Sequence, residues 1–106
     1  NPQLRIVGAQ PAEGAHIPGI RKWPAAYMPA IYDPAAVDEL MVVAQEEAEQ
    51  MARRMAAEEG LFCGISSGGA AHVAQRVAAR ERGATVVFVV CDSGERYLST
   101  GVFPAQ

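Results

Sequence analysis

The residues best suited to chemistry lie in a glycine- and serine-rich turn at 64–69, Gly-Ile-Ser-Ser-Gly-Gly. Glycines allow the backbone to approach a ligand closely. A helix that starts at such a turn offers free N–H groups and the positive end of its dipole, and Ser66 or Ser67 adds a hydroxyl. The turn therefore predicts a ligand-facing site. The alternative is that one serine caps the helix and the glycines only make a tight turn.

Two other chemical interpretations of this turn are weaker. A phosphate-binding P-loop requires lysine after its last glycine, and Ala70 stands there instead. Residues 64–68 do satisfy G-x-S-x-G, the pattern around a hydrolase nucleophile, which requires an acid and then a histidine later in the chain. His72 is the only later histidine and belongs to the same expected helix, while His16 lies upstream. The pattern thus favours a serine that binds a ligand over a nucleophilic serine.

The elements expected around the turn alternate between strands and helices. Alternating or continuous β-branched runs predict strands, and apolar residues at helical spacing predict helices. We expect strands at 4–9 and 37–43, helices at about 46–59 and 70–82, and a further strand at 85–91 buried on both faces. An irregular segment at 10–35 holds most of the prolines and is too long for an idle connection. This order predicts an α/β fold with a mostly parallel sheet and flanking helices.

Composition excludes several classes of protein. The formal net charge is -3 without a basic stripe, which argues against nucleic acid as a partner. The longest apolar run, 86–91, is too short to cross a membrane, and the first residues lack the apolar region of a signal peptide. Cys63 and Cys91 both follow apolar runs and are expected to be buried thiols, with no spacing typical of a metal site. This cysteine usage indicates a reducing, cytoplasmic environment.

Two long motifs resemble the cysteine synthase family, also called O-acetylserine sulfhydrylases. Residues 59–70, Glu-Gly-Leu-Phe-Cys-Gly-Ile-Ser-Ser-Gly-Gly-Ala, are similar to that family's EGI-x-x-G-[IV]-SSG-x-A segment, and residues 93–100 resemble its SGERYLST signature. The resemblance covers essentially all 106 residues. Residues 17–24, with an Arg-Lys-Trp run, and the Cys91-Asp92 pair resemble the B form of the family more than the A form.

The resemblance implies where this chain belongs in a larger fold. Residues 1–106 would be the C-terminal part of the large domain of a fold-type-II enzyme, similar to the tryptophan synthase β subunit, that uses pyridoxal 5′-phosphate. In this family a lysine near the N-terminus holds the cofactor as a Schiff base and a Gly/Thr-rich loop holds its phosphate. The only lysine here, Lys22, matches neither position. The chain would thus contain no catalytic residue of its own, and we expect it to be inactive alone.

The family's activity replaces the acetate of O-acetyl-L-serine by sulfide or thiosulfate, giving L-cysteine or S-sulfocysteine in cysteine biosynthesis. By resemblance the whole enzyme would be a cytoplasmic homodimer. A cystathionine β-synthase or Ser/Thr dehydratase relative shares the serine turn, although the 93–100 stretch and the Trp23 loop argue against that alternative. An alternative of another class is a binding module without catalysis.

Individual site residues follow from the same resemblance. Ser66 aligns with the serine that hydrogen-bonds the pyridine nitrogen of the cofactor, and we expect Gly64 and Asp92 beside it. The neutral Ser66 hydroxyl leaves that nitrogen largely unprotonated, which suits elimination more than transamination. Gly19, Arg21 and Trp23 would line the substrate mouth, where Arg21 or Lys22 would attract an anionic sulfur donor. The alternatives are that Asp92 only stabilises a turn and that Arg21 is an ordinary surface residue. Arg96 and Tyr97 are expected to tie the C-terminal turn onto the sheet.

Overall fold

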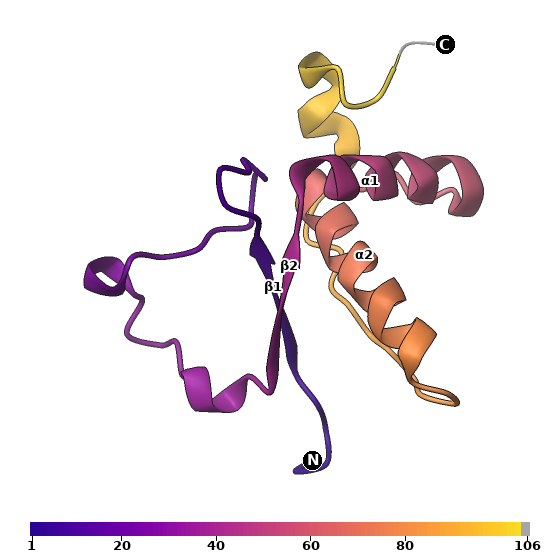
Figure 1. Ribbon diagram of the computed structural model, residues 1–106. Coiled ribbons are helices and arrows are strands. Elements are labelled where there is room, and N and C mark those ends of the chain that lie inside the picture. The colour runs from indigo at the N-terminus through magenta and orange to yellow at the C-terminus, as the bar shows by residue number, and fades with distance from the viewer. Residues whose placement is uncertain (105–106) are drawn as a thin grey trace.

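The computed structural model describes residues 1–104 as an α/β arrangement with a parallel sheet and two packed helices (Figure 1). The last two residues of the expected 1–106 unit lie outside the described part. The elements are β1 (Val7–Pro11), β2 (Glu39–Val43), α1 (Gln45–Glu59), α2 (Ile65–Arg80) and the short 3₁₀ helices η1 (Ala25–Tyr27), η2 (Pro34–Ala36) and η3 (Gly94–Thr100). The expected α/β class is confirmed, and so is the order of the first two strands and the two helices. Neither α-helix of residues 1–104 has the length and apolar character needed to span a bilayer.

The sheet consists of β1 and β2, which pair in parallel from Val7 opposite Glu39 to Pro11 opposite Val43. The chain crosses between them through the irregular segment 12–38, which lies on one side of the strands while both helices lie on the other (Figure 1). Asp38 fixes the end of this crossover, because its carboxylate accepts a hydrogen bond from the Ile6 amide at 2.7 Å. Both strands start later than the sequence predicts.

Helix α1 follows its predicted pattern. The apolar residues at helical spacing form its buried face, namely Ala48, Met51, Ala52 and Met55. At its start the Glu47 carboxylate accepts a hydrogen bond from the Ala44 amide at 2.8 Å, which satisfies one backbone donor and places a negative charge at the positive end of the dipole. Gly60 ends the helix with a φ of +69°, a left-handed conformation that glycine adopts without strain.

Helix α2 starts five residues earlier than predicted, at Ile65 instead of about Ala70. Gly64 is its N-cap, so Ser66 and Ser67 lie in the first turn and neither serine is the capping residue. Serine and glycine are poor helix formers, but burial of this turn against α1 outweighs their propensity. The buried face therefore lies near the start of the helix, and Ala78 close to its end is exposed.

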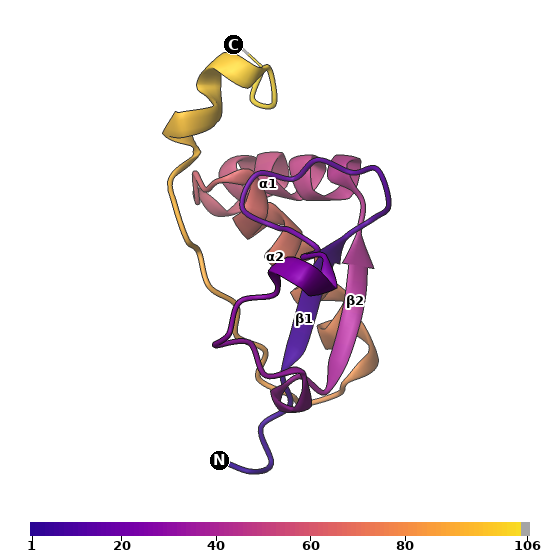
Figure 2. The same ribbon diagram turned by 90° about the vertical axis from the view of Figure 1, so that its left-hand side faces the viewer.

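The prediction of a buried strand at 85–91 is wrong for this chain. The segment is extended and runs in the same direction as β1 and β2, but it pairs with no strand of residues 1–104 (Figure 2). Val87 is 83% exposed and Val89 is 70% exposed. Cys91 is exposed as well, against expectation, whereas Cys63 is buried as predicted. A parallel strand is buried only when neighbouring strands and helices cover it, and residues 1–104 supply no strand beside this segment.

Candidate functional site

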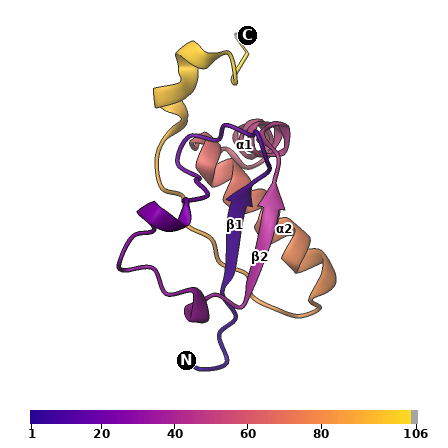
Figure 3. The same ribbon diagram turned by 60° about the vertical axis from the view of Figure 1, so that its left-hand side comes forward.

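The candidate site forms where the carboxyl ends of the parallel strands meet the start of α2. In open α/β sheets this edge is where ligands bind. The loop after β1 curls over the strand ends towards the start of α2, near the point where α1 also begins (Figure 3). Ile17, which is 3% exposed, anchors this loop in the main core cluster together with Val43 and Ile65. The loop and the helix start are thus held against one another by apolar packing.

Gly19 and Ser66, predicted as substrate and cofactor residues, lie in contact. Gly19 has a φ of +93°, and a Cβ added there would be 2.8 Å from Ser66 Cβ and 2.9 Å from Ser66 Oγ. Such contacts are too close for real atoms, so only glycine fits. Ser66 itself is 8% exposed in the first turn of α2. The loop therefore presents its backbone to the Ser66 hydroxyl.

Ser67 has a different role from Ser66, which the sequence did not distinguish. Ser67 is fully buried, and its hydroxyl oxygen accepts a hydrogen bond from the Cys91 amide at 3.1 Å. It joins the start of α2 to a segment 24 residues further along the chain. This assigns Ser67 to the scaffold and leaves Ser66 as the serine that lies against Gly19.

Asp92 lies against Gly64, the residue that precedes Ser66 by two positions in the chain. The Gly64 amide donates to the Asp92 carbonyl oxygen at 3.1 Å, and a Cβ at Gly64 would lie 2.7 Å from Asp92 Cγ. The Tyr97 hydroxyl donates to Asp92 Oδ2 at 2.8 Å, while Arg96 Nη1 stands 3.6 Å from the same oxygen. Ser93, not Asp92, accepts the Glu95 amide that starts η3. The side chain of Asp92 therefore faces the helix start instead of capping its own turn.

Burial governs the titration of two groups near this contact. Burial, together with the hydrogen bond to Asp92, raises the pKa of the Tyr97 hydroxyl, so this phenol stays protonated and donates. Burial also raises the pKa of the Cys63 thiol, which makes it a packing residue and not a nucleophile. Tyr97 also packs against the main core cluster, so it ties the C-terminal turn to both the core and the helix start.

Arg21 and Trp23 lie in a neighbouring part of the loop. The Arg21 guanidinium sits 5.6 Å from the centre of the Trp23 ring, within cation–π range. With Lys22, Arg21 lines an open cleft of about 780 Å³ at the carboxyl ends of β1 and β2. Ser66 does not line this cleft. The loop contacts Ser66 at Gly19 and lines the cleft at Arg21. The predicted substrate residues thus divide into Gly19 beside Ser66 and Arg21 in the cleft.

Ser66 offers a neutral hydroxyl, a group that fits the ring nitrogen of pyridoxal phosphate because it can donate a hydrogen bond to it. Two positions without side chains, Gly19 and Gly64, flank the serine, and each is in close contact with a neighbouring side chain. Asp92 Oδ1 is buried and has no hydrogen-bond partner among residues 1–104, so an unused acceptor lies close by. The only lysine, Lys22, lines the separate cleft. Within residues 1–104 no cluster of side chains is suited to hold a metal ion.

Comparisons with known proteins show which family this chain resembles. The family model described as pyridoxal-phosphate dependent enzyme matches residues 1–92. Cysteine synthase B of Salmonella typhimurium is 57% identical over 94% of the chain and 33% of the relative, and that of Pseudomonas aeruginosa is 52% identical over 97% and 34%. Among solved structures, a cysteine synthase from Entamoeba histolytica has a TM-score of 0.82 at 32% identity, covering 96% of this chain and 33% of the other. The chain spans about a third of the length of these relatives.

Proposed function

This chain belongs to the family of pyridoxal-phosphate dependent enzymes, and we propose that it is part of a cysteine synthase. The reaction would replace the acetate of O-acetyl-L-serine by sulfide or thiosulfate. The observation that carries the proposal is the placement of Ser66, a neutral hydroxyl held between Gly19 and the Gly64 turn at the ligand-binding edge of the sheet. The 52–57% identity to cysteine synthases B supports this reaction over those of the more distant structural neighbours.

Ser66 would hold the ring nitrogen of the cofactor, with Gly64 and Asp92 beside it. Pyridoxal phosphate, when bound, supplies the electron sink for β-replacement. A neutral hydroxyl leaves the ring nitrogen largely unprotonated, which favours loss of a leaving group over transamination. Tyr97 donates to Asp92 Oδ2, while Oδ1 lies against Gly64 and has no hydrogen-bond partner among the described residues, so this acceptor would stay beside the Ser66 turn.

Gly19, Arg21 and Trp23 would form the substrate mouth. Gly19 lets the loop pass close over Ser66, so that a substrate bound there would meet backbone instead of a side chain. Arg21 and Lys22 place two positive charges in the adjoining cleft, where His16 also lines the wall. These cations would attract thiosulfate, a dianion, more strongly than sulfide, and the stacked Trp23 would keep Arg21 in place.

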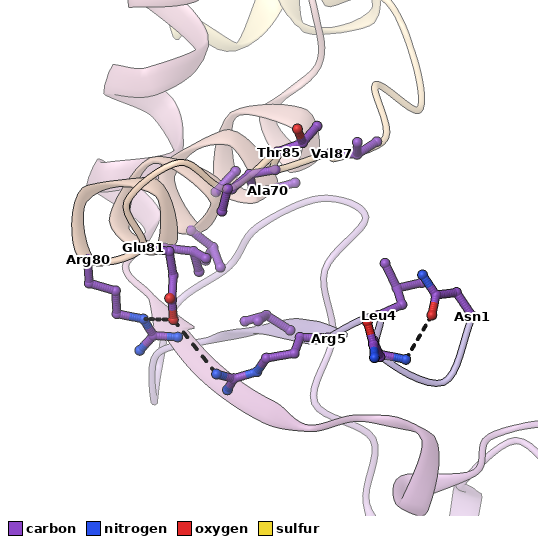
Figure 4. A pocket seen from close by; sticks show the side chains of 15 residues that line it. Asn1, Leu4, Arg5, Ala70, Arg80, Glu81, Thr85 and Val87 are labelled. Carbon is purple, nitrogen blue, oxygen red and sulfur yellow. Dashed lines mark hydrogen bonds and ion pairs between the residues drawn. The ribbon is translucent and has the colours of Figure 1, made fainter.

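The exposed apolar surface supports a place within a larger domain. A groove of about 510 Å³ lies between residues 1–7 and the extended segment 84–87, and apolar side chains of α2 line it (Figure 4). Arg5 and Arg80 both lie near Glu81 at one end of this groove, at 3.7 Å and 3.9 Å. We propose that residues 1–106 are the C-terminal part of a large domain whose other strands fill the groove, in a homodimeric cytoplasmic enzyme.

The test is product formation by the full-length protein that carries this segment. Purified protein is mixed with O-acetylserine and sulfide, and L-cysteine is measured. Ser66→Asp should lower the rate at least about tenfold, because a carboxylate beside the ring nitrogen would stabilise the protonated form of that nitrogen. Ser99→Asp, at an exposed serine, is the matched control and should change little. An unchanged rate in Ser66→Asp contradicts the assignment of Ser66, and a product formed only with a thiol other than sulfide would replace the proposed reaction.

A further inference from the structure

Residues 91–97 form a clasp around the start of α2. Their backbone makes an antiparallel bridge between Cys63 and Ser93. On either side of it the Gly64 amide donates to the Asp92 carbonyl at 3.1 Å, and the Gly94 amide donates to the Phe62 carbonyl at 3.2 Å. The turn before Ser66 is therefore hydrogen-bonded to a segment almost thirty residues further along the chain.

Side chains close the clasp at two further points. The Cys91 amide donates to Ser67 Oγ at 3.1 Å, which joins the clasp to the first turn of the helix. The Tyr97 hydroxyl donates to Asp92 Oδ2 at 2.8 Å and so fixes the carboxylate that lies against Gly64. Arg96 approaches the same oxygen, but its side chain is 74% exposed and solvent weakens this pair. Tyr97 is thus the main support of the Asp92 side chain.

The contact leaves no free space at Gly64. A Cβ at this position would lie 2.7 Å from Asp92 Cγ and 2.9 Å from Tyr97 Cε2. On the other side of the same turn, a Cβ added at Gly19 would lie 2.8 Å from Ser66 Cβ. Ser66 is consequently held between a loop that touches its side chain and a clasp that fixes the N-cap of its helix. A shift of the Asp92 carboxylate would be transmitted through Gly64 to the helix start.

We propose that Tyr97 is a positioning residue that acts through Asp92 and Gly64 to fix the Ser66 hydroxyl for binding the cofactor. This inference rests on the proposed function and deepens it. Without the Tyr97 hydroxyl, Asp92 has one exposed cation left as a partner, so its side chain turns toward solvent and the Gly64 turn loosens. Binding sites need their groups placed within about 0.5 Å, so a loosened turn weakens the bond that Ser66 makes.

A double-mutant cycle in the full-length protein tests this role. Tyr97→Phe is combined with Ser66→Ala, and the affinity of the apoprotein for pyridoxal phosphate is measured by absorbance titration. We expect Tyr97→Phe to raise the Kd about tenfold when Ser66 is present and less than about twofold when Ser66 is absent, because the two residues act on one bond. Tyr27→Phe, at a tyrosine that is 73% exposed, is the matched control and should leave the Kd unchanged.

The outcomes separate the positioning role from the proposed function. Equal losses of affinity in both backgrounds, or no loss with Tyr97→Phe, overturn the positioning role while leaving a cofactor-binding protein. A full-length protein that binds no pyridoxal phosphate overturns the proposed function itself. Asp92→Ala offers a second route if Tyr97→Phe unfolds the protein. It should also weaken binding only when Ser66 is present, and an equal effect in both backgrounds again overturns the role.

Discussion

The packing of α1 against α2 at Gly68 gives the sharpest prediction for stability. A Cβ at Gly68 would lie 2.8 Å from the Ala52 amide nitrogen and 2.9 Å from Ala52 Cβ, and closer still to the Ala48 carbonyl oxygen. Ala48 and Ala52 are fully buried and these contacts are largely with backbone, so no side chain can rotate away. Gly68→Ala must push the two helices apart.

The magnitude follows from two opposing terms. Overpacking against a rigid surface costs about 1–3 kcal/mol, and the upper end applies where backbone atoms are met. Alanine gains about 1 kcal/mol over glycine inside a helix. The net loss of unfolding free energy is therefore about 2 kcal/mol, which at an m-value of about 2 kcal/mol/M lowers the urea midpoint by about 1 M.

Gly69→Ala is the matched control for this prediction. It lies in the same helix and gains the same propensity, but its added Cβ would meet Ile20 Cδ1, the far end of a flexible side chain, at 2.7 Å. A rotamer change of Ile20 costs about 1 kcal/mol, so this variant should stay within about 1 kcal/mol of the parent. Urea denaturation followed by circular dichroism compares them. A Gly68→Ala protein as stable as Gly69→Ala would refute the reasoning from helix packing.

Three further predictions concern pH and substrate. Because the pKa of Tyr97 is raised, its stabilising effect is complete below the tyrosine value of about 10 in the unfolded chain and is lost as the pH rises through the folded pKa. Tyr97→Phe should reduce the slope of the unfolding free energy between pH 9 and 12 and leave the part due to Cys63, whose pKa is also raised. The hydrogen bond from Arg80 lowers the pKa of Glu39, so the ionised Glu39 contributes fully to the free energy of unfolding above about pH 4.3. This contribution fades as the pH falls through the pKa of Glu39 in the folded protein. Glu39→Gln should flatten the acid limb of a stability titration, and an unchanged limb would contradict the role of this ion pair. Replacing Arg21 and Lys22 by alanine should lower kcat/KM about tenfold for thiosulfate and little for sulfide, and equal losses would exclude the cationic cleft as a donor site.

The helical half of the fold was predictable because its signals are local. The spacing of Ala48, Met51, Ala52 and Met55 and the glycine at 60 place α1 correctly. The start of α2 was not predictable in this way, since Gly68 favours a turn until α1 packs against it. The prediction that residues 85–91 form a buried strand was wrong for a related reason. Its β-branched run predicts a strand, but pairing depends on neighbours that the described residues do not supply.

Which of the predicted site residues lie together could be foreseen only in part. Motifs pointed to Ser66, Gly64 and Asp92, and the structure places Asp92 directly against Gly64. No sequence pattern showed that Gly19, 47 residues before Ser66, would touch it, because the loop that carries it has no periodicity. The sequence also could not distinguish the roles of Ser66 and Ser67, because adjacent identical residues differ only in the direction of their side chains.

The most direct test of the central claim is the visible absorption of the full-length protein before and after O-acetylserine is added. We predict a cofactor band in the purified protein that changes when O-acetylserine is added and recovers when sulfide follows. In the Ser66→Asp variant the band should be present, but its response should be slowed. A protein without any cofactor band, or with a band that ignores O-acetylserine, would contradict the account.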